Sequence, residues 1–173
     1  MASLIYWLFS VAFVLGAVQM ASGYSYSNCI EKPYSKGTFQ CINRKETKIK
    51  NITKDLPSST INLTISNNYL GVIPDNSFGH LQKLEQLRLD HNNITTIGQS
   101  AFENLPHLTY LNLSFNQISV LNPAVFKDLH NLTFLSLTNN TLKRLPGGIF
   151  LHSSQTGNFN HEPKPSEKLF RGY

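Results

Sequence analysis

A period of 24 residues governs the middle of this chain of 173 residues. Asparagine, phenylalanine and several leucine or isoleucine positions return at this step, without insertion or deletion, from residue 60 to residue 150. One such unit cannot bury its own apolar face, so the units are stable only when they stack. The sequence therefore predicts a solenoid of four stacked units. The recurring positions are Asn68, Asn92, Asn116 and Asn140; Leu63, Leu87, Leu111 and Leu135; Ile65, Leu89, Leu113 and Leu137; Leu70, Ile94, Ile118 and Leu142; Ile73, Ile97, Leu121 and Leu145; and Phe78, Phe102, Phe126 and Phe150.

The pattern within a unit, LxxLxLxxNxIxxIxxxxFxxLxx, predicts how one coil folds. Its alternation places Leu87 and Leu89 on one side of a short strand and Arg88 on the other. We expect the strands of successive coils to pair in parallel. The asparagine after each strand is expected to be buried and to hydrogen-bond backbone groups of adjacent coils. The phenylalanines are expected to stack as a spine on the convex side.

This unit resembles the leucine-rich repeat, whose period is about 20 to 29 residues. The resemblance implies an α/β-type solenoid that forms a fragment of a horseshoe. Short parallel strands are expected on its concave face, and irregular or 3-10 segments on its convex face.

Residues 1–23 are uncharged and read as a signal peptide. Their apolar run, from Leu4 to Val18, has 15 residues and is shorter than the roughly 20 that span a bilayer. Small residues at Ala21 and Gly23 favour cleavage before Tyr24. No second such run follows, so we expect a secreted, extracellular or lumenal chain without a membrane span.

Six N-glycosylation sequons agree with export. An oxidising compartment also favours a disulfide between Cys29 and Cys41. The alternative, a metal site, is disfavoured because neither cysteine has a second ligand at metal-binding spacing. The predicted glycosylation sites are Asn51, Asn62, Asn93, Asn112, Asn131 and Asn139.

Residues 24–59 are predicted to form an amino-terminal cysteine cap that shields the first coil. The cap carries seven Lys and Arg against three Asp and Glu, a net +4 of the chain's +5. Lys48, Lys50 and Lys54 stand at even spacing and could contact the phosphates of a nucleic acid. A solvated charged cap is the favoured interpretation, so a nucleic-acid partner is open but not favoured.

The repeat pattern stops after Phe150. Residues 151–173 contain no repeat and no cysteine-rich closing cap, and they are predicted to be disordered. Since a solenoid normally ends in a cap, we expect the front part of a longer protein or a truncated form of one. Self-association through the uncapped carboxyl-terminal end is expected.

The repeat, the signal peptide and the two-cysteine cap that leads through Leu56 and Pro57 resemble the start of a Toll-like receptor ectodomain. The resemblance covers residues 24–150 and implies pathogen-pattern recognition in innate immunity. The chain departs from the family in having few repeats, no transmembrane helix and no signalling domain, so we expect at most a soluble binder or decoy. The alternatives are a secreted leucine-rich repeat adhesion or matrix protein, and a by-product without a binding role.

The concave face offers the candidate contact residues. Exposed aromatic side chains beside an arginine are typical of protein contact patches. The sequons at Asn62, Asn112 and Asn139 fall on the same face, so a solvated, partly glycosylated surface is the equal alternative. The partner, a protein or a microbial ligand, stays unknown. The candidate contacts are Arg88, His91, Tyr110, Phe115 and Phe134.

Catalytic motifs are missing from the sequence, so we expect neither enzyme activity nor a cofactor or metal. It contains no paired carboxylates, no GxSxG and no P-loop. Histidine is the side chain that would give a pH switch in an endosome. His80, His107 and His130 fall on the convex side, where plain surface residues are expected, and only His91 is concave.

Overall fold

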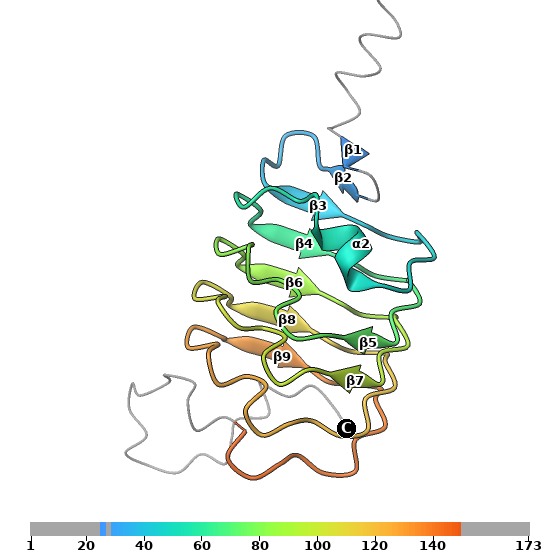
Figure 1. The fold of residues 1–173 in the computed structure, drawn as a ribbon, viewed down its shortest axis with the longest axis vertical. Coiled ribbons are helices and arrows are strands. Elements are labelled where there is room, and N and C mark those ends of the chain that lie inside the picture. Colours follow the sequence, from blue (N-terminus) through green and yellow to red (C-terminus); the bar gives the residue numbers. More distant parts are fainter. Residues whose placement is uncertain (1–24, 27–28, 150–173) are drawn as a thin grey trace, which may run out of the picture.

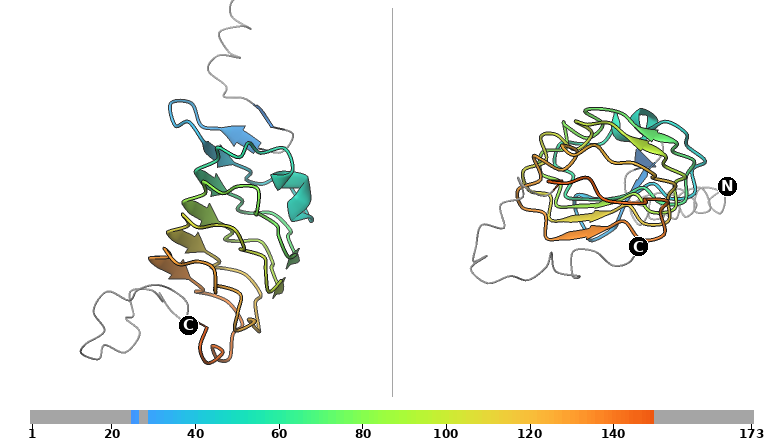
Figure 2. Two further views of the ribbon diagram at one scale, coloured as in Figure 1. Left: turned by 60° about the vertical axis from the view of Figure 1, so that its left-hand side comes forward. Right: turned by 90° about the horizontal axis from the view of Figure 1, so that it is seen from below.

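The computed structural model describes residues 25–26 and 29–149, which form a β-solenoid (Figure 1). The predicted signal peptide, the predicted tail and Phe150 lie outside the described residues. Each coil of the solenoid runs once around a common core, as the end-on view in Figure 2 shows.

The main sheet has the strand order β1-β2-β3-β4-β6-β8-β9, and each repeat contributes one three-residue strand to it. Its first three strands belong to the cap: β1 (Ser25–Tyr26), β2 (Cys29–Glu31) and β3 (Thr38–Gln40). Strands β4 and β6 pair in parallel, as do β6 with β8 and β8 with β9. The register follows the repeat, because Leu63 lies opposite Leu87 and Leu111 lies opposite Leu135. This confirms the predicted parallel stacking. The strands are β4 (Asn62–Thr64), β6 (Gln86–Arg88), β8 (Tyr110–Asn112) and β9 (Phe134–Ser136).

A second sheet lies on another side of the coils. It consists of β5 (Val72–Ile73) and β7 (Thr96–Ile97), which pair in parallel. The remaining segments of coils one to four are turns and bends, in agreement with the irregular convex side that was expected. The helix of the described part is α2 (Ile49–Thr53), with five residues.

The core is a set of apolar columns along the stack. Leu87, Leu111 and Leu135 are each 0% exposed. Phe78 stacks on Phe102 with ring centroids 6.0 Å apart, and Phe102 stacks on Phe126 at 6.1 Å. The phenylalanine spine is thus confirmed for these three residues. Its spacing exceeds the roughly 4.8 Å between paired strands, so this side of the stack is the wider one, as curvature toward the strands requires.

The cap contains a coil that the sequence prediction missed. Strand β3 (Thr38–Gln40) pairs in parallel with β4, and Phe39 lies opposite Leu63. Subtracting 24 from Leu63 and Ile65 gives Phe39 and Cys41, which are 1% and 0% exposed. Residues 36–59 therefore form a coil of the same stack, here called the cap coil, whereas the prediction placed the first coil at residue 60.

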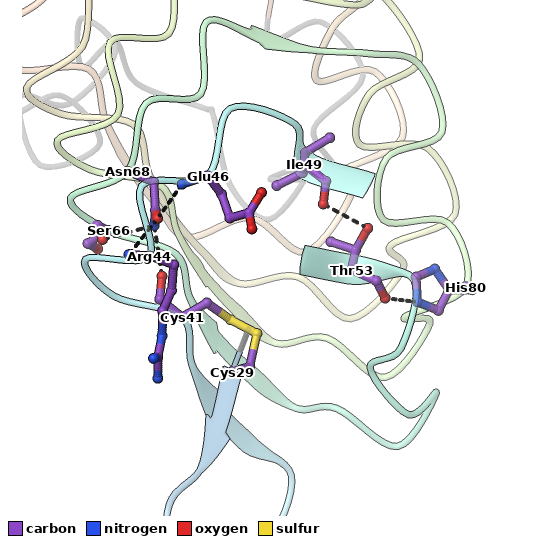
Figure 3. Close-up of a disulfide and its surroundings, with 9 residues drawn as sticks. All are labelled: Cys29, Cys41, Arg44, Glu46, Ile49, Thr53, Ser66, Asn68 and His80. Atoms are coloured by element: carbon purple, nitrogen blue, oxygen red, sulfur yellow. Dashed lines mark hydrogen bonds between the residues drawn. A yellow bond between two sulfur atoms is a disulfide. The ribbon is translucent and has the colours of Figure 1, made fainter. Parts of the chain in front are cut away.

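Two short strands and a disulfide close the stack at the cap. Strand β1 (Ser25–Tyr26) is antiparallel to β2 (Cys29–Glu31), and β2 is antiparallel to β3. The predicted disulfide is present, joining Cys29 to Cys41, the residue after β3 (Figure 3). It ties the closing strands to the end of the cap-coil strand.

Candidate functional site

The recurring asparagines connect neighbouring coils through their amides. Asn116 Nδ2 donates to the carbonyl oxygens of Leu89, Leu113 and Ser114 at 2.9 to 3.1 Å. Its Oδ1 accepts from the backbone N–H groups of Asn92 and Ile94 in the preceding coil. Asn68, Asn92 and Asn140 make equivalent bonds. These amides satisfy backbone groups at the exit of each strand, so their role is to shape the turn rather than to contact a ligand.

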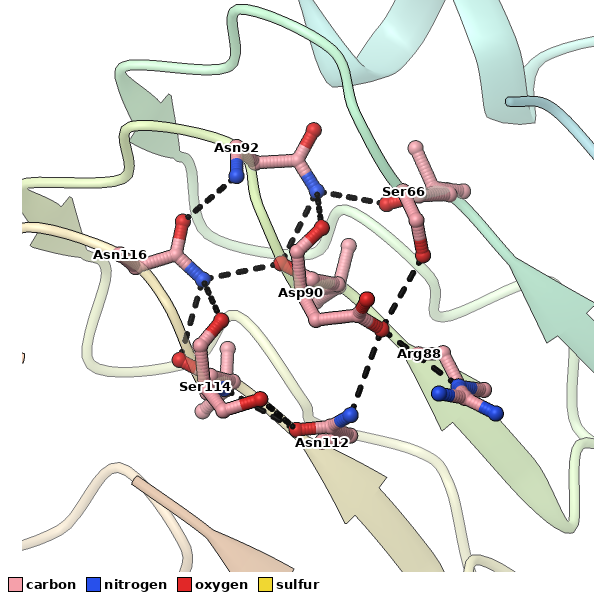
Figure 4. A network of polar contacts seen from close by, with 10 residues as sticks. Ser66, Arg88, Asp90, Asn92, Asn112, Ser114 and Asn116 are labelled. Carbon is pink, nitrogen blue, oxygen red and sulfur yellow. Dashed lines mark hydrogen bonds and ion pairs between the residues drawn. The ribbon is translucent and has the colours of Figure 1, made fainter. Parts of the chain in front are cut away.

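The middle of the strand face is a polar network (Figure 4). Asp90 Oδ1 accepts hydrogen bonds from Ser66 Oγ at 3.0 Å and from Asn112 Nδ2 at 3.3 Å. Asn112 Oδ1 accepts from the N–H and the hydroxyl of Ser114 at 3.0 and 2.7 Å. The four side chains are buried, with residue exposures between 5% and 9%.

This network corrects the expected contact face. The concave face was expected to be solvated and to include Asn112, but Asn112 is buried together with Ser66, Asp90 and Ser114. Strands about 4.8 Å apart bring short polar side chains of adjacent coils within hydrogen-bond reach, so these side chains cover one another. They form a rigid floor, and the accessible part of the face lies at its margins.

Two aromatic pairs stand at those margins. The rings of Tyr110 and Phe134, the first residues of β8 and β9, stack with centroids 4.3 Å apart. His91 and Phe115, in the turns after β6 and β8, also stack at 4.3 Å. Phe115 is 48% exposed. The structure therefore brings four of the five candidate contacts together as two pairs.

Arg88 is the charged member of the candidate set. Its Nε lies 3.4 Å from Asp90 Oδ1, and its side chain is 50% exposed. The buried carboxylate of Asp90 thus fixes one edge of the guanidinium, while half of the side chain stays open to solvent. An arginine held in this way can bind an anionic or carbonyl group of a ligand without first being ordered.

The position before each recurring asparagine has left-handed backbone geometry, and so does the matching position of the cap coil, Asn43. The φ angles are 56° at Asn43, 55° at Asn67, 57° at His91, 54° at Phe115 and 55° at Asn139. Asparagine tolerates this region, whereas it is strained for a bulky residue. These five residues are spaced by 24, and three of them are asparagine. The sequence alone therefore shows that His91 and Phe115 are the exceptions at this position.

The predicted glycosylation sites differ in accessibility. Asn51, Asn93, Asn131 and Asn139 are exposed, Asn62 is half-buried, and Asn112 is buried in the polar network. Asn62 Nδ2 donates to Thr38 Oγ1 at 3.1 Å, and its Oδ1 is buried without a hydrogen-bond partner among the described residues.

One histidine was assigned wrongly. His80 is exposed, as expected, but its Nε2 lies 3.0 Å from the carbonyl oxygen of Thr53, at the end of α2 (Figure 3). His80 therefore links the first repeat to the cap coil, and it is not a plain surface residue. The prediction failed because the partner is 27 residues away in sequence.

Residues 25–26 and 29–149 contain neither a metal-binding cluster nor a membrane-spanning helix. Within them no group of three or more His, Cys, Asp or Glu side chains is placed to hold a metal ion. No helix in the same residues is long and apolar enough to cross a membrane. The cap lysines Lys48, Lys50 and Lys54 are exposed, and Lys54 lies 4.0 Å from Asp55.

Comparisons with known proteins agree with this geometry. The family model described as "Leucine rich repeat" matches residues 58–118, 82–142 and 107–155. Among solved structures, the chain is similar to TLR13 in the crystal structure of a TLR13-ssRNA13 complex, with a TM-score of 0.58 and 29% sequence identity. That match covers 68% of this chain and 20% of the TLR13 chain, so this chain spans a fifth of its relative. A search of curated proteins found no match.

Proposed function

Since this chain belongs to the leucine-rich repeat family, we propose that it is an extracellular binding module that contacts a macromolecular ligand through the margins of its strand face. The contacts are the two aromatic pairs, Tyr110 with Phe134 and His91 with Phe115, together with Arg88. The polar network beneath them acts as a preorganised support.

The observation that carries the proposal is the conformation of Phe115. A bulky residue in the left-handed region costs about 1 to 3 kcal/mol. Asparagine occupies the same position in the coils of Asn67 and Asn139, so the turn itself does not need an aromatic ring. Because the ring is 48% exposed, it also gains little from burial. Stacking on His91, worth about 0.5 to 1.5 kcal/mol, offsets only part of this strain, and a contact outside the chain would account for the remainder.

The likeness to TLR13 supports a recognition role in innate immunity. We infer that the chain enters the secretory route through residues 1–23 and acts as a soluble binder or decoy of Toll-like type. The same likeness favours this role over that of an adhesion or matrix protein. TLR13 was solved with a single-stranded RNA, so RNA is one ligand class to test beside proteins.

Glycans fit around the proposed contact face. We infer that the exposed asparagines Asn51, Asn93, Asn131 and Asn139 are modified and that Asn112 is not, because its amide is buried and bonded to Asp90 and Ser114. An unmodified Asn112 leaves the centre of the strand face uncovered. Tryptic glycopeptide mapping of secreted material measures the occupancy of each site.

The test is a selection of random peptides displayed on phage against the secreted wild-type chain. Contact hot spots bind such peptides, so we expect enriched clones that lose about tenfold in affinity on Phe115→Asn. The matched control is Val72→Asn, at an exposed residue of the second sheet, which should bind them unchanged. A short single-stranded RNA is titrated against the same variants to decide whether the face also takes nucleic acid.

Stability separates the contact role from a structural one. In Phe115→Asn, relief of backbone strain offsets the lost stacking on His91, which is worth about 0.5 to 1.5 kcal/mol. We therefore expect the free energy of unfolding to change by less than about 1 kcal/mol. Clones that bind Phe115→Asn and the wild type equally well, or a large loss of stability, would contradict the proposal.

A further inference from the structure

A groove opens between the third and fourth coils, which contain β8 and β9, away from the strand face. Its volume is about 530 Å³. One wall comes from residues 119–121 and 123, and the other from residues 143–147. The lining residues are Val120, Leu121, Pro123, Lys143, Arg144 and Leu145, with the small or polar residues beside them.

The groove lies where the second sheet fails to continue. Adding 24 to the residues of β7 gives Val120 and Leu121, and a further 24 gives Arg144 and Leu145. Strand pairing at these positions holds coils one and two together, and Gly98 N–H also donates to Ile73 oxygen. The equivalent segments of coils three and four run below β7 in Figure 1 and are not strands.

The walls of the groove therefore present open backbone groups. Val120, Leu121, Arg144 and Leu145 make no hydrogen bond to any residue of the described part. The two coils do meet just before the groove, where Thr141 N–H donates to Ile118 oxygen at 3.0 Å. Backbone groups without a hydrogen-bond partner among the described residues, next to an existing two-stranded sheet, are a site at which an extended chain can pair.

The side chains define the chemistry of that chain. Val120 is 74% exposed, which is more than the matching residue of coil one, Val72, at 49%. Leu121 is buried beneath it, and Leu145 and Pro146 are half-buried, so the floor is apolar. Lys143 and Arg144 are exposed on one wall, and neither forms an ion pair within the described part of the chain.

We propose that this groove binds an extended peptide segment of a partner protein in which apolar and acidic residues alternate. In an extended chain such residues point to opposite sides, so the apolar ones enter the floor while the backbone pairs with residues 120–121 or 144–145. The carboxylates then lie near the rim, within reach of Lys143 and Arg144. The site is separate from the strand face and does not depend on the function proposed for it.

The experiment uses a fluorescent seven-residue peptide in which leucine or valine alternates with glutamate, with lysine replacing glutamate in a matched peptide. Fluorescence anisotropy against the full secreted chain should show binding of the acidic peptide that weakens as salt rises. The variants Val120→Asp and Lys143→Glu with Arg144→Glu should each weaken it about tenfold or more. The controls Val72→Asp and Lys83→Glu, at exposed residues outside the groove, should leave it unchanged.

Several outcomes overturn the proposal. Equal binding of the acidic and lysine peptides, or no loss on Val120→Asp, excludes an acidic-apolar ligand. Binding of a short single-stranded RNA that is lost on Lys143→Glu with Arg144→Glu but kept on Val120→Asp identifies a polyanion site instead. A dimer in sedimentation that is lost on Val120→Asp would identify a second copy of the chain as the occupant of the groove. Peptide binding that appears only after deletion of residues 151–173 would identify that segment as the occupant.

Discussion

Gly98, the residue after β7, packs closely against Asp75 of the preceding coil. Asp75 Oδ1 accepts from Ser100 N–H at 2.8 Å, and this bond places Asp75 directly against Gly98. A Cβ on Gly98 would lie 2.7 Å from the backbone nitrogen of Asp75 and would also collide with its Oδ1. Coil two thus has no room for a side chain at residue 98, although glycine's special φ range is not involved. The restriction is local, because the equivalent positions of the other coils are Pro74, Asn122 and Pro146.

The change Gly98→Ala should therefore destabilise the chain by about 1 to 3 kcal/mol, the usual cost of overpacking. The matched change is Gly71→Ala, since nothing lies within 4 Å of a Cβ at Gly71. It should be neutral or stabilise by up to about 1 kcal/mol, because alanine restricts the unfolded chain. Urea denaturation of both variants measures the difference, and equal midpoints would contradict the packing at Gly98.

The side-chain amides of the recurring asparagines allow a second prediction at the scale of single residues. Asn116→Leu removes the acceptor of Asn92 and Ile94 N–H groups and the donor to three carbonyls, so it should cost at least about 1 to 3 kcal/mol. The control is Asn67→Asp, an exposed position outside any sequon with φ of 55°, where aspartate keeps the tolerance for left-handed geometry. A thermal melt that falls equally for both variants would be evidence against a structural ladder.

The place of a residue in the coil was predictable from the sequence wherever the 24-residue spacing alone determines it. Leu89 and Asn92 take their places from spacing alone, because each has a single role in the coil. Asp90 and Asn112 could not be placed in this way, since their burial depends on which polar side chain stands 22 to 24 residues away. A pairing across coils is a property of two units and is invisible in the pattern of one.

Among the elements, the cap coil shows why a boundary is harder to predict than a repeat. Phe39, Cys41 and Ile49 keep the 24-residue step, but Arg44 stands where the asparagine should be. Only its backbone N–H takes part, donating to Asn68 Oδ1 at 3.0 Å. A prediction that requires the asparagine therefore begins the repeats one coil too late. Helix α2 was also missed, since five residues carry too little helical periodicity to be recognised.

Helix α2 and His80 provide a prediction for this element. His80→Ala should remove the bond to Thr53 oxygen, which is worth about 0.5 to 1.5 kcal/mol, and loosen the last turn of α2. Amide exchange should rise in residues 49–56 and stay unchanged in β6 and β8. His107→Ala, at an exposed convex residue, serves as the control. Identical exchange in α2 for both variants would show that His80 does not hold the cap coil.

The molecule as a whole is a row of coils in which each contacts only its neighbours, so stability varies along the row. The cap end has the disulfide, which closes a loop with a sequence separation of 12 and contributes about 3 kcal/mol at most on the chain-entropy model. At the other end, β9 pairs only with β8 among the described strands, and Leu142 and Leu145 are only partly buried. Local opening should therefore begin at the fourth coil.

Hydrogen exchange followed by mass spectrometry can test this gradient. Peptides that cover β6 and β8 should be the most protected, those from β9 to Ile149 the least, and those of the cap coil intermediate. The double change Cys29→Ser with Cys41→Ser should raise exchange in β2 and β3 and leave β9 unchanged, because the affected coils are not neighbours. Uniform protection along the chain, or a rise in β9 exchange in the double variant, would mean that the stack opens as one cooperative unit. The groove between coils three and four gives the gradient a local cause, since the coils that lack the second-sheet pairing are the ones predicted to open first.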